Sequence, residues 1–279
     1  KKKVLILDCD LEAPGYLSFF NLDKHSDLNS GKTNGFVEFL NDINFCENND
    51  DVDIDNYWIN VVYGNDTLAD YDLTGLENIR LMPAGNLNRK PDIEDDDNYI
   101  LLNQTHYLEG LSRLNFSNKN ALLSGFNQLI KKAKDSFEPD VILIDSRTGF
   151  NDIIGTISIS ISKMVVAFLG FNAQTRPGSL FISNMLKDQD KELVVVNSIL
   201  SKEYDYKDEL RSMTNLFGDN GSIPNMFQLH RNCVLERIGQ YNISDKQDAG
   251  MKDLIDLIKN SKNDNCEKNG GNEDYYDLF

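Results

Sequence analysis

The sequence predicts an α/β fold with a doubly wound, mostly parallel sheet flanked by helices. Three short aliphatic runs, at Val4–Leu7, Val141–Ile144 and Leu193–Val196, have the continuous apolar character of strands that are buried on both faces. Helical patterns separate such runs, most clearly over residues 118–137. Strands that alternate with helices are typical of a parallel sheet covered on both sides.

Composition places the chain among globular proteins and excludes some functions. The 279 residues are 40% hydrophobic and 26% charged, which is ordinary for a globular domain. The net charge of −17 disfavours non-specific nucleic-acid binding, which depends on lysine and arginine. No apolar run reaches the roughly 18 residues of a membrane span, so we expect no membrane association. The scattered cysteines Cys9, Cys46, Cys233 and Cys266 lack CxxC spacing and are expected to be free thiols of a cytoplasmic protein.

The stretch around which the chain is organised is Val4–Gly15, VLILDCDLEAPG. Its aliphatic run leads directly into Asp8 and Asp10, at the carboxyl end of the predicted strand, where open α/β sheets bind ligands. A second stretch, VILIDSRTGFND, repeats this arrangement with Asp145 and Gly149. Acids at the tips of two buried strands indicate the metal edge of a nucleotide site, although strand-end solvation and turn capping also accommodate such acids.

The other elements follow in order. Residues 16–22 form a short amphipathic segment, and Asn34 is expected to cap a helix that includes Phe36 and Leu40. Spacings of three to four residues predict a helix over 118–137, which Glu138-Pro139 ends. The remaining predicted elements are strands at 58–63, 78–82, 164–169, 193–200 and 222–229, and helices at 153–161, 178–186 and 246–260.

Two motif-like segments do not satisfy their motifs. Ser30-Gly31-Lys32-Thr33 ends like a phosphate loop, but Ser26 occupies the position of the required glycine and the preceding segment is polar. The acidic segment 47–56 begins like a calcium loop, but Asn56 stands where glycine is required and Val62 where glutamate is required. We interpret the first as a helix start and the second as a solvated loop.

Taken together, DCDLEAPG and LIDSRTG resemble two motifs of the ParA/MinD-like branch of the P-loop ATPases, which has a deviant Walker A motif. The first is similar to the family's second acidic motif, and the second to its Walker B strand and switch. Pro83-Ala84-Gly85 is also similar to the end of a strand in that family. The resemblance covers most of residues 1–240. It implies the P-loop NTPase fold and binding of ATP with Mg²⁺.

The resemblance also implies a domain organisation. We expect one ParA/MinD-like nucleotide-binding domain over 1–260, with a loop-rich insertion at 41–98, followed by a disordered acidic tail at 261–279. The family's phosphate loop, KGG-x-G-[KR]-[ST], does not occur at its expected place. We therefore expect it upstream of Lys1, with its strand and helix, and interpret the chain as a fragment of a longer protein.

Site roles are carried over from the family residue by residue. Asp145 would hold Mg²⁺ through water with Asp8 in the same outer shell, and Asp10 would orient the attacking water. The Gly149 N–H would meet the γ-phosphate. Asn197, late in the strand at 193–200, would read adenine, since an amide both donates and accepts; alternatively it caps the turn after its strand. Arg147 has no assigned counterpart.

Three functions remain open at this stage. The first is an ATPase that dimerises around nucleotide and signals, as a switch, to a protein partner or fused effector domain. The second is a non-catalytic scaffold or sensor of the same fold. The third is a tyrosine kinase or amidoligase on the related fold, for which Tyr275-Tyr276 offers little support.

Overall fold

The computed structural model describes the chain in segments that form two compact units. One unit comprises Lys1–Ser162 with Arg237–Tyr241, and the other Lys163–Glu236 with Asn242–Phe279; each is described by itself. The predicted single domain over 1–260 with its insertion stays a prediction. The described residues are 2–20, 22–29, 34–46, 49–66, 75–87, 107–115, 118–146, 157, 159–170, 191–200, 205–218, 225–230 and 255–258.

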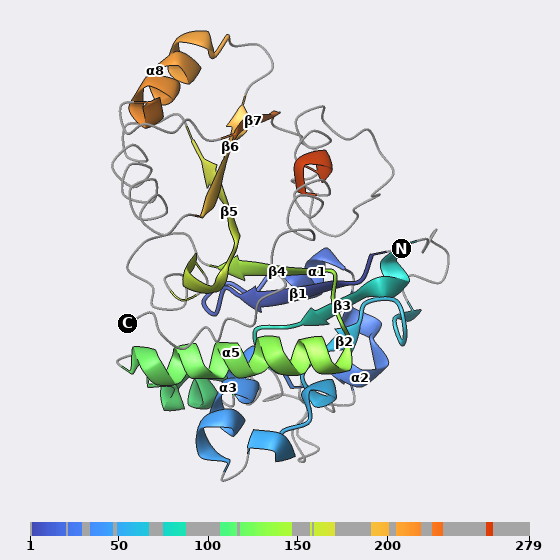
Figure 1. Cartoon of the computed structure of the whole chain (residues 1–279). Coiled ribbons are helices and arrows are strands. Elements are labelled where there is room, and N and C mark those ends of the chain that lie inside the picture. The colour runs from blue at the N-terminus through green and yellow to red at the C-terminus, as the bar shows by residue number, and fades with distance from the viewer. Residues whose placement is uncertain are drawn as a thin grey trace, which may run out of the picture. The chain divides into compact units, whose positions relative to one another are not determined.

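The first unit is built on a four-stranded sheet of order β2-β3-β1-β4 (Figure 1). The strands are β1 (Val4–Cys9), β2 (Ile59–Asn60), β3 (Ile79–Met82) and β4 (Val141–Ser146). β1 is parallel to both of its neighbours, β3 and β4, and only β2 runs antiparallel, to β3. The named helices of this unit are α1 (Tyr16–Phe19), α2 (Ser26–Asn29), α3 (Phe36–Phe45) and α5 (Lys119–Ser136), with 3₁₀ turns at Leu22–Lys24, Asn49–Asp51, Ile54–Asn56 and Leu76–Asn78.

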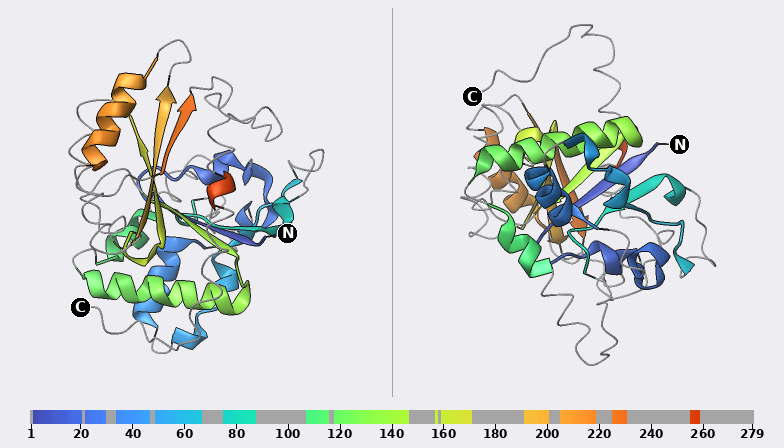
Figure 2. Two further views of the ribbon diagram at one scale, coloured as in Figure 1. Left: turned by 45° about the horizontal axis from the view of Figure 1, so that its top comes forward. Right: turned by 90° about the horizontal axis from the view of Figure 1, so that it is seen from below.

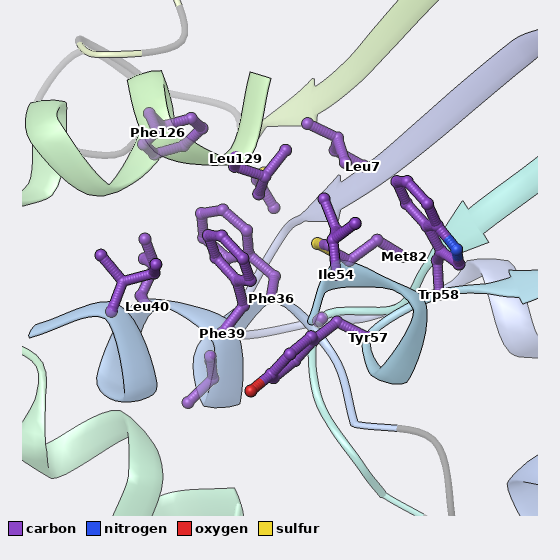
Figure 3. Close-up of a cluster of buried hydrophobic side chains, with 14 of the residues drawn as sticks. Leu7, Phe36, Phe39, Leu40, Ile54, Tyr57, Trp58, Met82, Phe126 and Leu129 are labelled. Carbon is purple, nitrogen blue, oxygen red and sulfur yellow. The ribbon is translucent and has the colours of Figure 1, made fainter. Parts of the chain in front are cut away.

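Helices α3 and α5 cover one face of this sheet and enclose the larger core (Figures 1 and 2). Figure 3 shows its aromatic centre, where the ring centroids of Phe36 and Phe126 lie 5.0 Å apart. Phe39 meets Tyr57 edge to face at 5.2 Å, a geometry that adds to the gain from burial. β1 faces this core through its odd-numbered residues Leu5, Leu7 and Cys9.

The opposite face of the sheet carries a smaller core formed with α1, α2 and the turn between them. Ile6 of β1 and Leu81 of β3 pack there against Phe20, Leu22 and Leu28. Because successive side chains of a strand point to opposite faces, β1 is apolar from Val4 to Leu7 to fill both cores. This two-sided burial explains why residues 4–7 form a continuous apolar run without alternation of polar and apolar residues.

Helix α5 confirms the sequence prediction in detail. The Asn118 side chain caps it by accepting a hydrogen bond from the Ala121 N–H at 3.1 Å. The five apolar residues of the predicted face are all buried, as their helical spacing required. Glu138 has φ 52°, a left-handed conformation that ends the helix before Pro139. The buried face comprises Leu122, Phe126, Leu129, Ala133 and Phe137.

Helix α3 starts one residue later than predicted. Gly35, and not Asn34, is the N-cap residue, and the Glu38 carboxylate accepts a hydrogen bond from its N–H at 2.9 Å. The helix start lies so close to the turn after β3 that a Cβ on Gly35 would approach the Pro83 carbonyl oxygen to 2.4 Å. A residue with a side chain therefore cannot occupy the cap position here, which the sequence pattern alone did not reveal.

At the amino-terminal end of the sheet, the positively charged Arg80 side chain lies over two aromatic rings. The Arg80 guanidinium lies 4.9 Å from the ring centroid of Trp58 and 4.3 Å from that of Phe137. It also pairs with the Asp55 carboxylate at 3.2 Å. Stacking of this kind suits the planar guanidinium and ties β3 to the end of α5.

The second unit repeats the layered arrangement with a parallel sheet of order β5-β6-β7. Its strands are β5 (Met164–Leu169), β6 (Glu192–Leu200) and β7 (Asn225–His230). Helix α8 (Lys207–Gly218) packs on one face, and residues 255–258 pack on the other. Both units therefore have helical segments on both faces of a mostly parallel sheet, which confirms the predicted fold class.

Some predicted elements differ from the structure or lie outside the described residues. The strand expected at 58–63 is limited to the two residues of β2. The helix expected at 178–186 and the tail at 261–279 lie outside the described residues. The cysteines that are described, Cys9 and Cys46, form no disulfide bond. No described helix is both long enough and apolar enough to span a membrane.

Candidate functional site

The strand register brings the two predicted acids together. β1 and β4 pair in parallel with Asp8 directly opposite Asp145. Neighbouring strands lie about 4.8 Å apart, and residues in register project from the same face of a parallel sheet. The two carboxyl groups therefore lie side by side at the carboxyl edge of the sheet, as the two sequence motifs had suggested.

The alternation along each strand shows which face carries the acids. Ile6 of β1 belongs to the α1-side core, so Asp8, two residues later, points to that same face. On β4, Ile142 and Ile144 pack on the α3/α5 side, which leaves Leu143 and Asp145 on the α1 side. Leu143 is 42% exposed, so the sheet face beside the acids is open at this point.

Asp8 is a buried carboxyl group with unmet hydrogen-bonding capacity. The residue is 1% exposed, and its Oδ1 accepts a hydrogen bond from the Asp10 N–H at 3.3 Å. Its Oδ2 has no hydrogen-bond partner among the described residues. Burial raises the pKa of Asp8 to about 7, although the Asp10 N–H opposes this shift; the charge of Asp145 adds to it. A buried carboxylate oxygen without a donor is expensive unless a proton or a cation compensates it.

Asp145 is more exposed than Asp8, and a tyrosine influences its pKa. The pKa of Asp145 is raised, mainly by partial burial of the carboxyl group, and the Tyr16 hydroxyl opposes this shift. The pKa of Tyr16 is itself raised, first by burial and then by the charges of Asp145 and Asp8. Tyr16 was not among the residues predicted for the site, and no motif in the sequence distinguishes it.

The loop after β1 is held by local and long-range hydrogen bonds. Asp10 accepts a hydrogen bond from the Ala13 N–H at 3.3 Å, which closes a turn beside Asp8. The buried Tyr107 hydroxyl donates to the Leu11 carbonyl oxygen at 2.8 Å, although the two residues lie 96 positions apart. Tyr107 is a second site residue that sequence reasoning missed, because nothing in its own segment marks it.

The acid pair could serve as part of a magnesium site. Among the described residues, no group of three or more His, Cys, Asp or Glu side chains is arranged to hold a metal ion. Mg²⁺ is commonly bound through only one or two carboxylates, with water and substrate phosphates completing its coordination. Two adjacent carboxyl groups, one with an unpartnered oxygen, fit that mode of binding.

Asn197 lies in the second unit, on the central strand β6. It pairs in register with Leu169 of β5 and Gln228 of β7, and the β6–β7 register shifts directly after it. The side chain is fully buried, and neither its Nδ2 nor its Oδ1 has a hydrogen-bond partner among the described residues. Buried amide groups in proteins normally form hydrogen bonds. The hydrogen-bond partner of the Asn197 amide is therefore not among the described residues.

Several predicted site residues lie outside the described part of the chain. These are Gly149 and Arg147, together with the phosphate-loop-like Gly31-Lys32-Thr33. The described geometry therefore assembles Asp8, Asp10 and Asp145 at one sheet edge and neither supports nor opposes the role expected of Gly149.

Fold and site together define an α/β protein that presents carboxyl groups at the carboxyl edge of a parallel sheet, the edge at which such sheets bind ligands. No protein-family model matches the chain, and no curated protein matches it significantly. Solved structures do resemble it. A Borrelia burgdorferi protein assigned to plasmid partition and crystallised with AMPPNP has a TM-score of 0.55 and 15% identity, over 93% of this chain and 85% of that one.

A second structure of a plasmid partition protein from Borrelia burgdorferi has a TM-score of 0.52 and 17% identity, over 93% of this chain and 84% of the other. At such identities the likeness establishes the fold alone. It agrees with the sheet and helix layers described above.

Proposed function

We propose that this protein binds ATP together with Mg²⁺ at the carboxyl edge of the β1–β4 sheet and acts as a nucleotide-dependent switch that hydrolyses ATP. The observation that carries the proposal is the pairing of Asp8 with Asp145, in register on adjacent parallel strands, with Asp8 Oδ2 left without a partner. Like charges placed side by side and partly buried are costly, and functional sites are where such arrangements are retained.

Each acid has a distinct role in this proposal. Asp145, the more exposed of the pair, holds Mg²⁺ through water, and Asp8 supports it from the outer shell. When bound, the ion neutralises charge on the phosphates. Asp10, on the turn beside Asp8, orients the attacking water, and the Gly149 N–H contacts the γ-phosphate. In phosphoryl transfer the protein contributes mainly positioning and charge compensation, which acids fixed at strand ends can provide.

The similarity in fold supports the choice of nucleotide. The Borrelia burgdorferi protein with a TM-score of 0.55 was crystallised with AMPPNP, an analogue of ATP. We further propose that the protein forms a homodimer around nucleotide and transmits its state to a protein partner or a fused effector domain. Location in the cytoplasm, and the absence of direct nucleic-acid and membrane binding, stay predictions from the sequence.

The proposal is tested by calorimetric titration of ATP into the full-length protein, with Mg²⁺ or with EDTA, alongside phosphate release and the molar mass in solution. We expect ATP to bind more tightly with Mg²⁺, to be hydrolysed, and to increase the fraction of dimer. Binding without hydrolysis would favour the scaffold or sensor alternative. No binding under either condition would refute the proposal.

A separate prediction concerns adenine recognition by Asn197. In the full-length protein, Asn197→Ala is expected to weaken ATP binding by about 1–3 kcal/mol, the cost of losing one or two buried hydrogen bonds. The melting temperature without nucleotide should not fall, because neither amide atom has a described partner to lose. Calorimetry with ATP and GTP, together with thermal unfolding, measures both effects.

The alternative role of Asn197, capping the turn after β6, predicts the opposite pair of results. A lost cap would lower the melting temperature and leave nucleotide affinity unchanged. Unchanged affinity with no altered preference between ATP and GTP would therefore show that Asn197 does not read the base.

A further inference from the structure

The Tyr107 hydroxyl connects the loop after β1 with a distant part of the chain. It donates a hydrogen bond to the Leu11 carbonyl oxygen at 2.8 Å, and both residues are 6% exposed. Leu11 lies inside the turn that the Asp10 carboxylate closes by accepting a hydrogen bond from the Ala13 N–H. This turn is therefore held both by the Asp10 side chain and by the Tyr107 hydroxyl.

Close packing fixes the direction of the Tyr107 ring. A Cβ on Gly85, in the turn after β3, would lie 2.5 Å from both Cδ2 and Cε2 of the ring. Glycine at this position therefore lets the ring lie directly against the backbone. Tyr107 and Leu11 also belong to the same buried core, under α3 and α5. Burial raises the pKa of Tyr107, so the hydroxyl keeps its proton and remains a donor.

The segment that carries Tyr107 is itself fixed to α3. Residues 107–113 are helical, and the Asn41 side chain of α3 donates a hydrogen bond to the Gly110 carbonyl oxygen at 2.8 Å. A Cβ on Gly110 would approach Cγ1 of Val37 to 3.0 Å, so the two helical segments pack closely at this point. The hydroxyl thus acts on the loop after β1 from a rigid support.

The lengths of the hydrogen bonds show why this support matters. The Asp10 N–H donates to Asp8 Oδ1 at 3.3 Å, and the Ala13 N–H donates to Asp10 Oδ1 at 3.3 Å, so both local bonds are longer than typical N–H···O bonds. The bond from Tyr107 is shorter, at 2.8 Å, and it is buried. Without the hydroxyl, the Leu11 carbonyl group would lose this donor, and a buried carbonyl without a donor favours a backbone movement toward water.

We infer that Tyr107 is a positioning residue, whose hydroxyl holds the Leu11 carbonyl group and thereby fixes the Asp10 carboxylate for orienting the attacking water. This inference rests on the proposed function. The backbone at Asp10 is tied on one side to Asp8, through its own N–H, and on the other side to Tyr107, through Leu11. Displacement of a reacting group by about 1 Å can reduce the rate of an enzyme by about 10²-fold.

The test compares Tyr107→Phe with the control Tyr57→Phe in the full-length protein. Tyr57 is a matched control because it is also 6% exposed in the same core, and its hydroxyl donates to the Asp42 carboxylate of α3 instead of the loop after β1. Each substitution removes one hydroxyl and its hydrogen bond, so both variants are expected to melt at a lower temperature than the unmodified protein.

Phosphate release and calorimetric titration of ATP with Mg²⁺ are therefore measured well below the melting temperatures of both variants. We expect Tyr107→Phe to lower kcat by about tenfold or more and to leave ATP affinity unchanged, because only the water-orienting group is displaced. Tyr57→Phe should leave both quantities unchanged. A merely structural role of Tyr107 would give the result of the control.

A second measurement does not depend on hydrolysis. Order parameters of the backbone N–H groups of residues 10–13, from nuclear magnetic resonance relaxation without nucleotide, should fall in Tyr107→Phe and not in Tyr57→Phe. Unchanged order parameters or an unchanged kcat in Tyr107→Phe would overturn the inference even if the protein binds and hydrolyses ATP as proposed. Absence of hydrolysis in the unmodified protein would instead contradict the proposed function, and with it the role of Tyr107 in turnover.

Discussion

Asp145→Ala in the full-length protein is expected to abolish Mg²⁺-dependent ATP binding, whereas Asp10→Ala is expected to retain bound ATP and stop its turnover. The difference follows from the positions of the two residues. Asp145 lies in register with Asp8 at the sheet edge, where a cation would compensate both charges. Asp10 lies on the turn beyond it, where it can orient a water molecule. Loss of a group that assists proton transfer or water positioning commonly costs about 10²- to 10⁴-fold in rate.

Calorimetry with Mg²⁺ or EDTA and a phosphate-release assay separate these two outcomes. Asp205→Ala is a suitable control, because Asp205 lies in the second unit and forms an exposed ion pair with Lys207. Hydrolysis at the normal rate in Asp10→Ala would remove its assignment as the water-orienting group. If ATP binding by Asp145→Ala still depends on Mg²⁺ as strongly as in the unmodified protein, the cation does not bind at Asp145.

Asp8→Asn is expected to stabilise the protein without nucleotide at pH 8 and to leave its stability nearly unchanged at pH 4. The folded protein raises the pKa of Asp8 to about 7, mainly by burial, from the ordinary aspartate value of 3.8. Between these values the folded state binds more protons than the unfolded state. The free energy of unfolding therefore falls as the pH rises through this window and stays lower above it. Asparagine does not ionise and avoids this loss.

A pKa difference of one between the folded and unfolded states corresponds to about 1.4 kcal/mol. The increase in the free energy of unfolding of Asp8→Asn at pH 8 should therefore not exceed about 4 kcal/mol. Denaturant unfolding between pH 4 and pH 9 measures it. Asp205→Asn should show no comparable gain, because the pKa of Asp205 is lowered by Lys207 and not raised. If Asp8→Asn and the unmodified protein are equally stable from pH 4 to pH 9, ionised Asp8 does not destabilise the folded protein. The same substitution should weaken Mg²⁺-dependent binding, a trade of stability against function.

Local patterns were sufficient to predict some of the regular elements, but not helix α8, for which the sequence analysis had no counterpart. Helix α5, at Lys119–Ser136, lies within the helix predicted over 118–137, because its apolar spacing and the Glu138-Pro139 that ends it act within a few turns. β1 and β4 were identified for a similar reason, since strands buried on both faces need continuous apolar runs. The prediction was wrong where long-range packing decided the conformation. The close approach of Gly35 to Pro83 moved the start of α3, and β2 was shorter than its composition suggested.

The sequence by itself determined that two aliphatic strands end in aspartates, that an asparagine lies late in a third, and that helices alternate with these strands. Only the tertiary structure decided that Asp8 lies opposite Asp145, because strand register depends on packing across the sheet and not on either segment alone. It also decided that Asp8 Oδ2 and both amide atoms of Asn197 are buried without described partners. The Tyr107 hydroxyl donates to the Leu11 carbonyl oxygen from 96 positions along the chain, a contact that no local motif encodes.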